Sequence, residues 1–291
     1  MIPPSFDYQA PETLADAVAL LSENPGAKIL SGGQSLIPMM RFRLAEPVLI
    51  VDINRVTGLE YIKEEDGWLK IGGLTRESAV DGSSLVASRY PLLADTARLI
   101  ADPLVRNRAT VGGNLAHADP ANDHPATMLA YRARVVVTGP AGQREIPIDE
   151  FFLGPFESSL SQDEILTEVR IPSSNGRSGG AYQKLERKVG DYATAAVAAQ
   201  VTLDGAGKVA SVGIGLTNVG LTPIRASAAE DYLIGKAPTP ENISQAASLA
   251  AEAAEPEPDY RGSEAYKRSL VRTLAHRALM KAVERASGGQ A

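Results

Sequence analysis

Residues 28–36, KILSGGQSL, place a glycine pair and a small polar residue directly after a short apolar run. The run predicts a strand over residues 28–30, followed by a helix over residues 36–44 and a second strand over residues 48–53. In this small β-α-β unit the glycine turn lies at the carboxyl end of the first strand, where α/β folds commonly bind ligands. Glycines there let the backbone approach a ligand and adopt left-handed angles, so that successive N–H groups can converge on phosphate oxygens.

A second glycine pair stands in residues 109–126, ATVGGNLAHADPANDHPA, where Asn114 follows it. Thr110 and the polar residues 119–123 surround this pair with hydrogen-bonding groups. One such segment alone is better explained by a tight turn, but two of them on opposite sides of a pyrophosphate indicate a dinucleotide site. Neither has the G-x-G-x-x-G pattern of a Rossmann unit, which disfavours a nicotinamide cofactor bound in that way.

Two further patterns resemble functional sites, and each has a plainer explanation. Gly213-Ile214-Gly215 follows a strand pattern, but Asn218 occupies the sixth position of a phosphate-binding fingerprint and Pro223 precedes any helix. We therefore expect a core strand with close backbone contacts there. A cluster of metal-ligand residue types has a spacing that matches no metal motif, so we expect no metal in this chain. The cluster consists of His117, Asp119, Asp123 and His124.

Composition limits the partners and cofactors of the chain. With 291 residues, 44% of them apolar, it is long enough for two or three domains with a buried core. Its net charge of -6 gives no electrostatic footprint for nucleic acid, so we expect no such partner. Because the chain has no cysteine, it cannot ligate an ordinary iron–sulfur cluster, and any such cluster must belong to a partner. No apolar run approaches the roughly 20 residues that span a bilayer, so we expect a cytoplasmic protein with no transmembrane segment.

The polar stretch SSNGRSGG at residues 173–180 predicts a linker between two domains. We place the N-terminal domain at residues 1–175 and the C-terminal domain at residues 176–291. Beyond the linker, three consecutive strand patterns joined by turns precede three helical patterns, so the C-terminal domain is predicted to be α+β. The helical patterns cover residues 226–233, 242–254 and 263–286.

Four segments in this order and spacing make the chain resemble a known family. They are SGGQSLIPMM at 31–40, ADPLVRNRATVGGNLAHADPANDHPA at 101–126, KLERKVGDYATAA at 184–196 and IGLTNVGLTPIRA at 214–226. They resemble the FAD-binding medium subunits of aerobic molybdenum carbon monoxide dehydrogenases and, more broadly, the FAD domains of the xanthine dehydrogenase family. The resemblance implies an α+β fold with a two-lobed FAD-binding domain of the vanillyl-alcohol-oxidase type. A small C-terminal domain with a three-stranded antiparallel sheet and helices would follow it.

The resemblance also implies which residues bind FAD, and it implies no catalytic residue. Two loops would hold the pyrophosphate and adjoining groups, and they comprise Ser31, Gly32, Gly33, Gln34 and Ser35 with Thr110, Val111, Gly112, Gly113 and Asn114. Asp123 matches a polar FAD contact, Lys184 a contact near the flavin, and Tyr192 an aromatic beside the isoalloxazine ring. Close relatives have an alanine and a histidine in the first loop where this chain has Ser31 and Gln34, which indicates a different branch of the family.

The resemblance implies partners as well. A large subunit would carry the molybdenum cofactor and a small subunit two [2Fe–2S] clusters, in a dimer of heterotrimers that is cytoplasmic or loosely associated with the inner face of the membrane. Electrons would pass from the clusters to FAD and on to an external acceptor. Carbon monoxide is the leading substrate, and purines, N-heterocycles and aldehydes are alternatives. A stand-alone FAD oxidase of the same fold, or a non-catalytic nucleotide-binding module, would explain the same loops.

Overall fold

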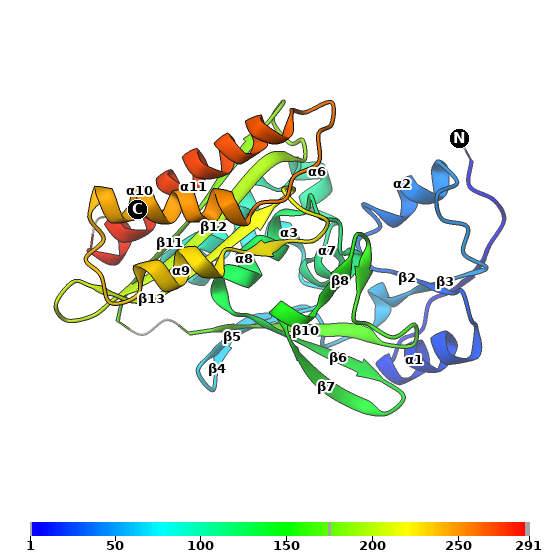
Figure 1. Cartoon of the computed structure of the whole chain (residues 1–291). Helices are drawn as coiled ribbons and strands as arrows, with labels where there is room; N and C mark the ends of the chain where they lie inside the picture. The colour runs from blue at the N-terminus through cyan, green and yellow to red at the C-terminus, as the bar shows by residue number, and fades with distance from the viewer. Residues whose placement is uncertain (1, 174–175, 289–291) are drawn as a thin grey trace.

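The computed structural model describes residues 2–173 and 176–288, and its N-terminal part is a small parallel sheet (Figure 1). Strands β1 (Asp7–Gln9), β3 (Leu49–Asp52) and β2 (Lys28–Leu30) lie in that order, joined by helices α1 (Leu14–Glu23) and α2 (Leu36–Arg41) and followed by a 3-10 turn (Ile53–Arg55). α1 begins after Thr13, whose side chain accepts a hydrogen bond from the Asp16 N–H. The β-α-β unit is therefore confirmed. β1 was not predicted, because its residues are all exposed and carry no apolar alternation.

The second part is an antiparallel sheet with helices on its inner face. Its strands lie in the order β4 (Ile62–Glu65), β5 (Trp68–Gly72), β10 (Ile165–Pro172), β6 (Arg134–Gly139) and β7 (Gly142–Pro147). The helices are α3 (Glu77–Asp81), α4 (Ser84–Arg89), α5 (Pro91–Leu99), α6 (Pro103–Arg106), α7 (Val111–His117) and α8 (Asp123–Tyr131), with a 3-10 turn at Ile148–Glu150. A short hairpin of β8 (Phe152–Gly154) and β9 (Glu157–Ser158) completes this part.

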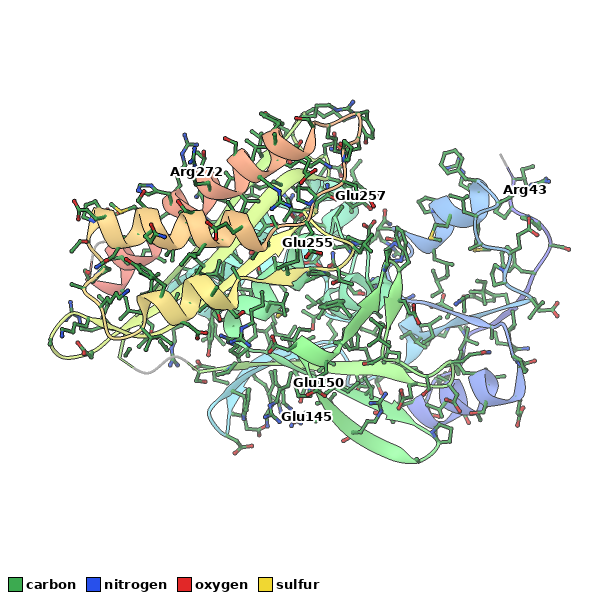
Figure 2. All side chains as sticks on the ribbon, viewed as in Figure 1. Arg43, Glu145, Glu150, Glu255, Glu257 and Arg272 are labelled. Atoms are coloured by element: carbon green, nitrogen blue, oxygen red, sulfur yellow. The ribbon has the colours of Figure 1, made fainter. Side chains whose placement is uncertain are left out.

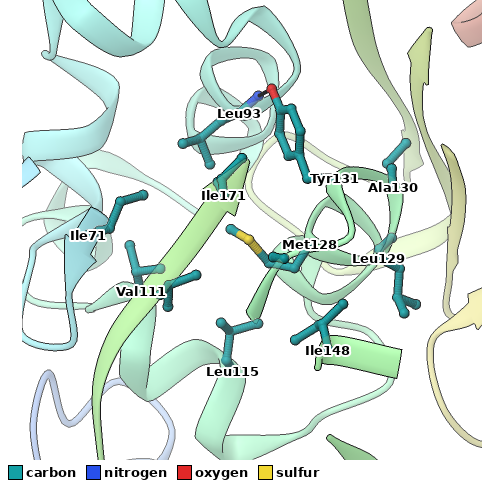
Figure 3. Packing of buried hydrophobic residues seen from close by; sticks show 14 of the residues in the cluster. Ile71, Leu93, Val111, Leu115, Met128, Leu129, Ala130, Tyr131, Ile148 and Ile171 are labelled. Atoms are coloured by element: carbon teal, nitrogen blue, oxygen red, sulfur yellow. Dashed lines mark hydrogen bonds between the residues drawn. The ribbon is translucent and has the colours of Figure 1, made fainter. Parts of the chain in front are cut away.

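The two faces of this sheet differ in polarity. On the inner face, Val111 and Leu115 of α7 and Met128 of α8 pack with Ile71 and Ile171 of the sheet (Figure 3). The outer face is charged: Glu145 of β7, labelled in Figure 2, forms ion pairs with Arg134 of the adjacent strand β6 and with Arg170 of β10, the next strand beyond it. This alternation is that of an antiparallel sheet buried on one face only.

The C-terminal part is a sheet between two helical layers (Figure 1). Strands β11 (Arg177–Glu186), β12 (Ala193–Leu203) and β13 (Val209–Thr217) are antiparallel, and the two-residue β14 (Ile224–Arg225) adds a fourth strand at the edge. On β12, Val197 and Ala199 share a core with helices α9 (Ser227–Leu233), α10 (Pro240–Ala253) and α11 (Glu264–Ala286). Ala196 and Ala198 point the other way, into the core that contains α5 and α8. The α+β fold and the three long strands are thus confirmed.

Two glycines of β13 allow α8 to lie directly on the sheet. A Cβ atom on Gly213 would overlap the carbonyl oxygen of Ala130, and one on Gly215 would overlap that of Ala126. Both oxygens belong to α8, and the segment is buried. The expectation of a core strand with close backbone contacts is therefore confirmed.

The linker prediction is wrong for residues 177–180. These residues begin β11, and the glycines there serve close packing: a Cβ on Gly179 would overlap the Ala282 carbonyl oxygen of α11, and one on Gly180 would lie 2.7 Å from the Leu92 Cβ of α5. Residues 174 and 175, at the predicted domain boundary, lie outside the described residues. The division at residue 175 stays a prediction. Across the described parts of the chain, no helix is both long and apolar enough to cross a membrane.

Candidate functional site

A cavity of about 800 Å³ lies where the three parts of the molecule meet. This volume is in the usual range of small-molecule and cofactor sites. Nearly all of the predicted FAD-contacting residues line it, namely Ser31, Gly32, Gly33, Gln34, Ser35, Thr110, Gly112, Gly113, Asn114, Asp123, Lys184 and Tyr192. Val111 is the exception: its side chain is fully buried in the core against the sheet, as Figure 3 shows, so it does not line the cavity.

The first glycine segment lines this cavity and has free backbone N–H groups. Gly33 has a φ of 75°, a left-handed angle that favours glycine. Within the described chain, the N–H groups of residues 32–36 find no intramolecular hydrogen-bond acceptor, and the Ser35 side chain forms no capping bond to α2. Successive unpaired N–H groups around a left-handed glycine make a concave site for an anion.

The second glycine segment is built differently from the prediction. It is the first turn of α7, where Thr110 Oγ1 accepts a hydrogen bond from the Gly113 N–H at 3.1 Å. The N–H groups of Val111, Gly112 and Asn114 also have backbone acceptors, so this segment is not a left-handed cradle of free N–H groups. Position 112 requires glycine, because a Cβ atom there would lie 2.6 Å from the Gly73 carbonyl oxygen.

The Asn114 side chain supplies an unpaired polar group, which the backbone of the second segment does not. Its side-chain Oδ1 is buried and has no partner among the described residues, while its carbonyl oxygen accepts a bond from Asn122 Nδ2 at 2.9 Å. A buried amide oxygen without a partner is costly unless a ligand pairs with it. Asn114 is therefore a polar group of α7 that is available to a bound molecule.

The two glycine segments touch each other. The hydroxyl oxygens of Ser31 and Thr110 lie 2.7 Å apart, and a Cβ on Gly32 would be 2.7 Å from the Ala109 Cα. Their placement on opposite sides of a pyrophosphate stays a prediction. They form one continuous wall, in which the first segment offers N–H groups and the second offers side chains.

A buried polar cluster lies farther along the cavity. Asp123, the first residue of α8, accepts hydrogen bonds from the Tyr182 hydroxyl at 2.6 Å and from Lys184 Nζ at 2.9 Å. Lys184 Nζ also donates to the Leu99 carbonyl at 3.0 Å. Burial raises the pKa of Asp123, and the Lys184 ammonium opposes this rise. The structure thus brings together Asp123 and Lys184, which stand far apart in the sequence.

Tyr192 stands at the rim of the cavity, and Arg261 holds its loop. Arg261 donates one hydrogen bond to the Tyr192 carbonyl at 2.9 Å and another to Asp191 Oδ1 at 3.0 Å, and this bond lowers the pKa of Asp191 to about 2. Sequence reasoning missed Arg261, because it lies in no motif and approaches Tyr192 only through the fold. It also missed Phe156 of the β8–β9 hairpin, which lines the cavity and packs on the His117 ring at 5.2 Å between centroids.

The cluster of metal-ligand residue types is divided between two environments. The Nε2 of His124 lies 2.8 Å from Glu77 Oε2 in the protein interior, whereas His117 faces the cavity. Among residues 2–173 and 176–288, no group of three His, Asp or Glu side chains is arranged to hold a metal ion.

These features define a class of protein. A wall of free N–H groups beside an unpaired amide oxygen, continued by a buried lysine and ending at an exposed tyrosine, fits an extended nucleotide cofactor with phosphates at one end and an aromatic ring at the other. The chain belongs to a family of that class: residues 4–174 match the FAD binding domain in molybdopterin dehydrogenase, and residues 180–282 match the CO dehydrogenase flavoprotein C-terminal domain.

Individual relatives agree with this assignment. The chain is 45% identical over 280 residues to the carbon monoxide dehydrogenase medium chain of Hydrogenophaga pseudoflava, covering 96% of this chain and 97% of that one. It is 40% identical to the 6-hydroxypseudooxynicotine dehydrogenase complex subunit alpha of Paenarthrobacter nicotinovorans, over 98% of this chain and 97% of that one. The solved carbon monoxide dehydrogenase of Hydrogenophaga pseudoflava that lacks the Mo-pyranopterin moiety superposes with a TM-score of 0.95 at 46% identity, over 98% and 99% of the two chains.

Proposed function

We propose that this chain is the FAD-binding subunit of a molybdenum-containing carbon monoxide dehydrogenase, which takes electrons from the [2Fe–2S] clusters of a partner subunit and passes them to an external acceptor. The observation that carries the proposal is the single cavity that joins both glycine segments to Asp123, Lys184 and Tyr192. The absence of cysteine agrees with this division of labour, since the iron–sulfur clusters must lie in another chain.

The residues of the cavity have distinct roles in this proposal. The free N–H groups of residues 32–36 bind the pyrophosphate oxygens, and the Asn114 side chain pairs with a polar group of the cofactor. Lys184, which is ion-paired with Asp123, places an ammonium group within the cavity, while Tyr192 covers the ring and limits its contact with water. FAD, when bound, supplies redox chemistry that connects one-electron and two-electron carriers.

The proposal includes the assembly and the domain plan. Carbon monoxide dehydrogenase relatives imply a large and a small partner subunit. We propose a dimer of heterotrimers, located in the cytoplasm or loosely attached to the inner face of the membrane. We also propose that residues 1–175 form the FAD-binding domain and residues 176–291 the C-terminal domain.

A second substrate class has support from one observation. The 6-hydroxypseudooxynicotine dehydrogenase subunit is 40% identical to this chain, close to the 42% of the carbon monoxide dehydrogenase medium chain of Afipia carboxidovorans. The alternative is therefore a flavin subunit of a related molybdenum hydroxylase that acts on an N-heterocycle, purine or aldehyde. Turnover of the assembled complex with each substrate separates the two.

Expressed alone, the chain is expected to bind FAD weakly or incompletely and to oxidise neither carbon monoxide nor any of these alternatives. The reason is that it has neither a substrate-activating metal site among its described residues nor a conductor to the flavin. Steady-state reduction of an artificial acceptor, with and without the large and small subunits, measures this. Substrate-dependent reduction by the single chain, with no molybdenum or iron present, would show that it is a stand-alone oxidase.

Tyr192→Ala is expected to leave FAD bound while shifting the reduction potential of the flavin, because the pyrophosphate wall still anchors the cofactor. Tyr192→Phe should leave the potential and its pH dependence unchanged. Burial and the carboxylates of Asp119 and Asp123 raise the pKa of Tyr192 to about 12. Its hydroxyl therefore stays protonated and neutral from about pH 6 to pH 10.

Potentiometric titration of the flavin across that pH range gives the result for both variants. A shift in Tyr192→Ala without a shift in Tyr192→Phe supports an aromatic role. If Tyr192→Ala leaves the potential and the reoxidation rate unchanged, Tyr192 only shapes the rim of the cavity.

A further inference from the structure

The first glycine segment has few internal bonds, and its fixed shape must come from outside it. The N–H groups of residues 32–36 find no acceptor in the described chain. The bonds within the segment and to the helix that follows are made by its carbonyl groups: the Gly33 carbonyl accepts from the Ile37 N–H, the Ser35 carbonyl from the Met39 N–H, and the Gly32 carbonyl from Gln34 Nε2 at 3.3 Å. A loop that receives a rigid pyrophosphate gains affinity when its bound shape is already formed. Residues outside the loop must therefore hold Ser31 and Gly32 in place.

Asn54 holds the start of the loop in place through side-chain hydrogen bonds. Its Nδ2 donates to the Ser31 carbonyl at 2.9 Å and to Asp52 Oδ1 at 2.6 Å. The same Asp52 oxygen accepts the Asn54 backbone N–H at 2.9 Å, so the Asn54 side chain has little freedom to rotate. Asn54 is partly buried and does not line the cavity, so it acts on a ligand only through Ser31.

Arg76 connects Asn54 to the second glycine segment. One guanidinium nitrogen donates to Asn54 Oδ1 at 2.5 Å, and the other donates to the Arg108 carbonyl at 2.5 Å. That carbonyl is the group against which Gly32 packs, because a Cβ on Gly32 would overlap its oxygen. The backbone of Arg76 also forms a β-bridge with Thr110, and Arg76 is absent from the cavity lining.

We propose that Arg76 and Asn54 form a clamp that positions the two glycine segments for the cofactor pyrophosphate. The clamp joins residues 31–32 to residues 108–110, which come from distant parts of the sequence, through two side chains that do not touch the ligand. Arginine suits this task because its planar fork donates two hydrogen bonds in fixed directions at once, whereas lysine has a single nitrogen. This inference rests on the proposed FAD site.

The test measures the dissociation constant for FAD of the full-length chain by fluorescence titration. Arg76→Met should raise that constant about tenfold or more, as loss of charge-assisted hydrogen bonds does. Arg76→Lys should restore part of the affinity, because it can keep one of the two bonds. Asn54→Ala should weaken binding by a similar factor, and the double variant should be little weaker than either single one, since both residues act in one chain of contacts.

Arg170→Met is the matched control. Arg170 also donates two side-chain bonds, to Glu168 and Glu145, but it does so on the outer face of the five-stranded sheet and outside the cavity lining. The FAD affinity of the Arg170→Met variant should equal that of the unaltered chain. At saturating FAD the reduction potential of the flavin in Arg76→Met should also be unchanged, because the clamp acts at the phosphate end.

Each outcome has one meaning. If the unaltered chain binds no FAD, the proposed function fails. If it binds FAD and Arg76→Met binds equally well, or no worse than Arg170→Met, the clamp is refuted while the FAD site stands. An Arg76→Lys variant as weak as Arg76→Met, additive losses in the double variant, or a shifted flavin potential would also refute it.

Discussion

Gly33→Val is expected to abolish FAD binding. Gly33 has a φ of 75°, where a β-branched residue is strained by about 1–3 kcal/mol. A Cβ there would also lie 2.7 Å from Ile37 Cδ1 and 3.1 Å from Leu30 Cδ1. The loop would have to change shape, and its free N–H groups would no longer converge. We expect FAD affinity to fall about 100-fold or more, equivalent to about 3 kcal/mol, which flavin content after gel filtration and fluorescence titration would show.

Gly58→Val controls for backbone strain alone. Gly58 has a φ of 81° and no heavy atom within 4 Å of its Cβ position, and it lies outside the cavity. The variant should lose a similar amount of conformational stability and keep its flavin. Full flavin content in Gly33→Val would mean that the first glycine segment does not bind the pyrophosphate.

The parts of the fold that could be predicted from sequence are those with a local cause. The strand at residues 28–30 ends at its own glycine turn, and the predicted helix begins directly after that turn, at Leu36. The resemblance added the two-domain FAD architecture. The cavity residues could be named because both glycine segments are short, local signals that the fold then brings together.

The features that were mispredicted depend on contacts between distant residues. Gly179 and Gly180 look like a flexible linker, but both positions require glycine because α11 and α5 pack closely against β11 and leave no room for a Cβ atom. Gly112 and Gly113 look like a turn, since glycine disfavours helices, yet Gly73 requires a glycine at position 112 and Thr110 caps the resulting helix. The positions of Arg76 and Arg261 follow from tertiary structure alone. No pattern around either residue indicates which carbonyl it will reach.

Gly213→Ala is expected to be the most destabilising single change that we propose. Gly213 has no left-handed angle, so alanine adds no backbone strain, but its Cβ would overlap the Ala130 carbonyl oxygen of α8. Neither group is the end of a flexible side chain, so the helix must separate from the sheet. Overpacking of this kind costs about 3 kcal/mol or more. For a chain of this size the melting temperature should fall by roughly 10 °C, measured by circular dichroism.

Gly205→Ala is the matched control, because Gly205 lies in the turn between β12 and β13 and a Cβ there would meet no heavy atom within 4 Å. Its melting temperature should stay near that of the unaltered chain. The pair of variants also separates the two interpretations of Gly213-Ile214-Gly215. If the segment bound phosphate, Gly213→Ala would lower FAD affinity and leave the stability of the cofactor-free protein unchanged. Gly213 and Gly215 both face α8 and lie outside the cavity lining. We therefore expect Gly213→Ala to lower the melting temperature of the cofactor-free protein as well.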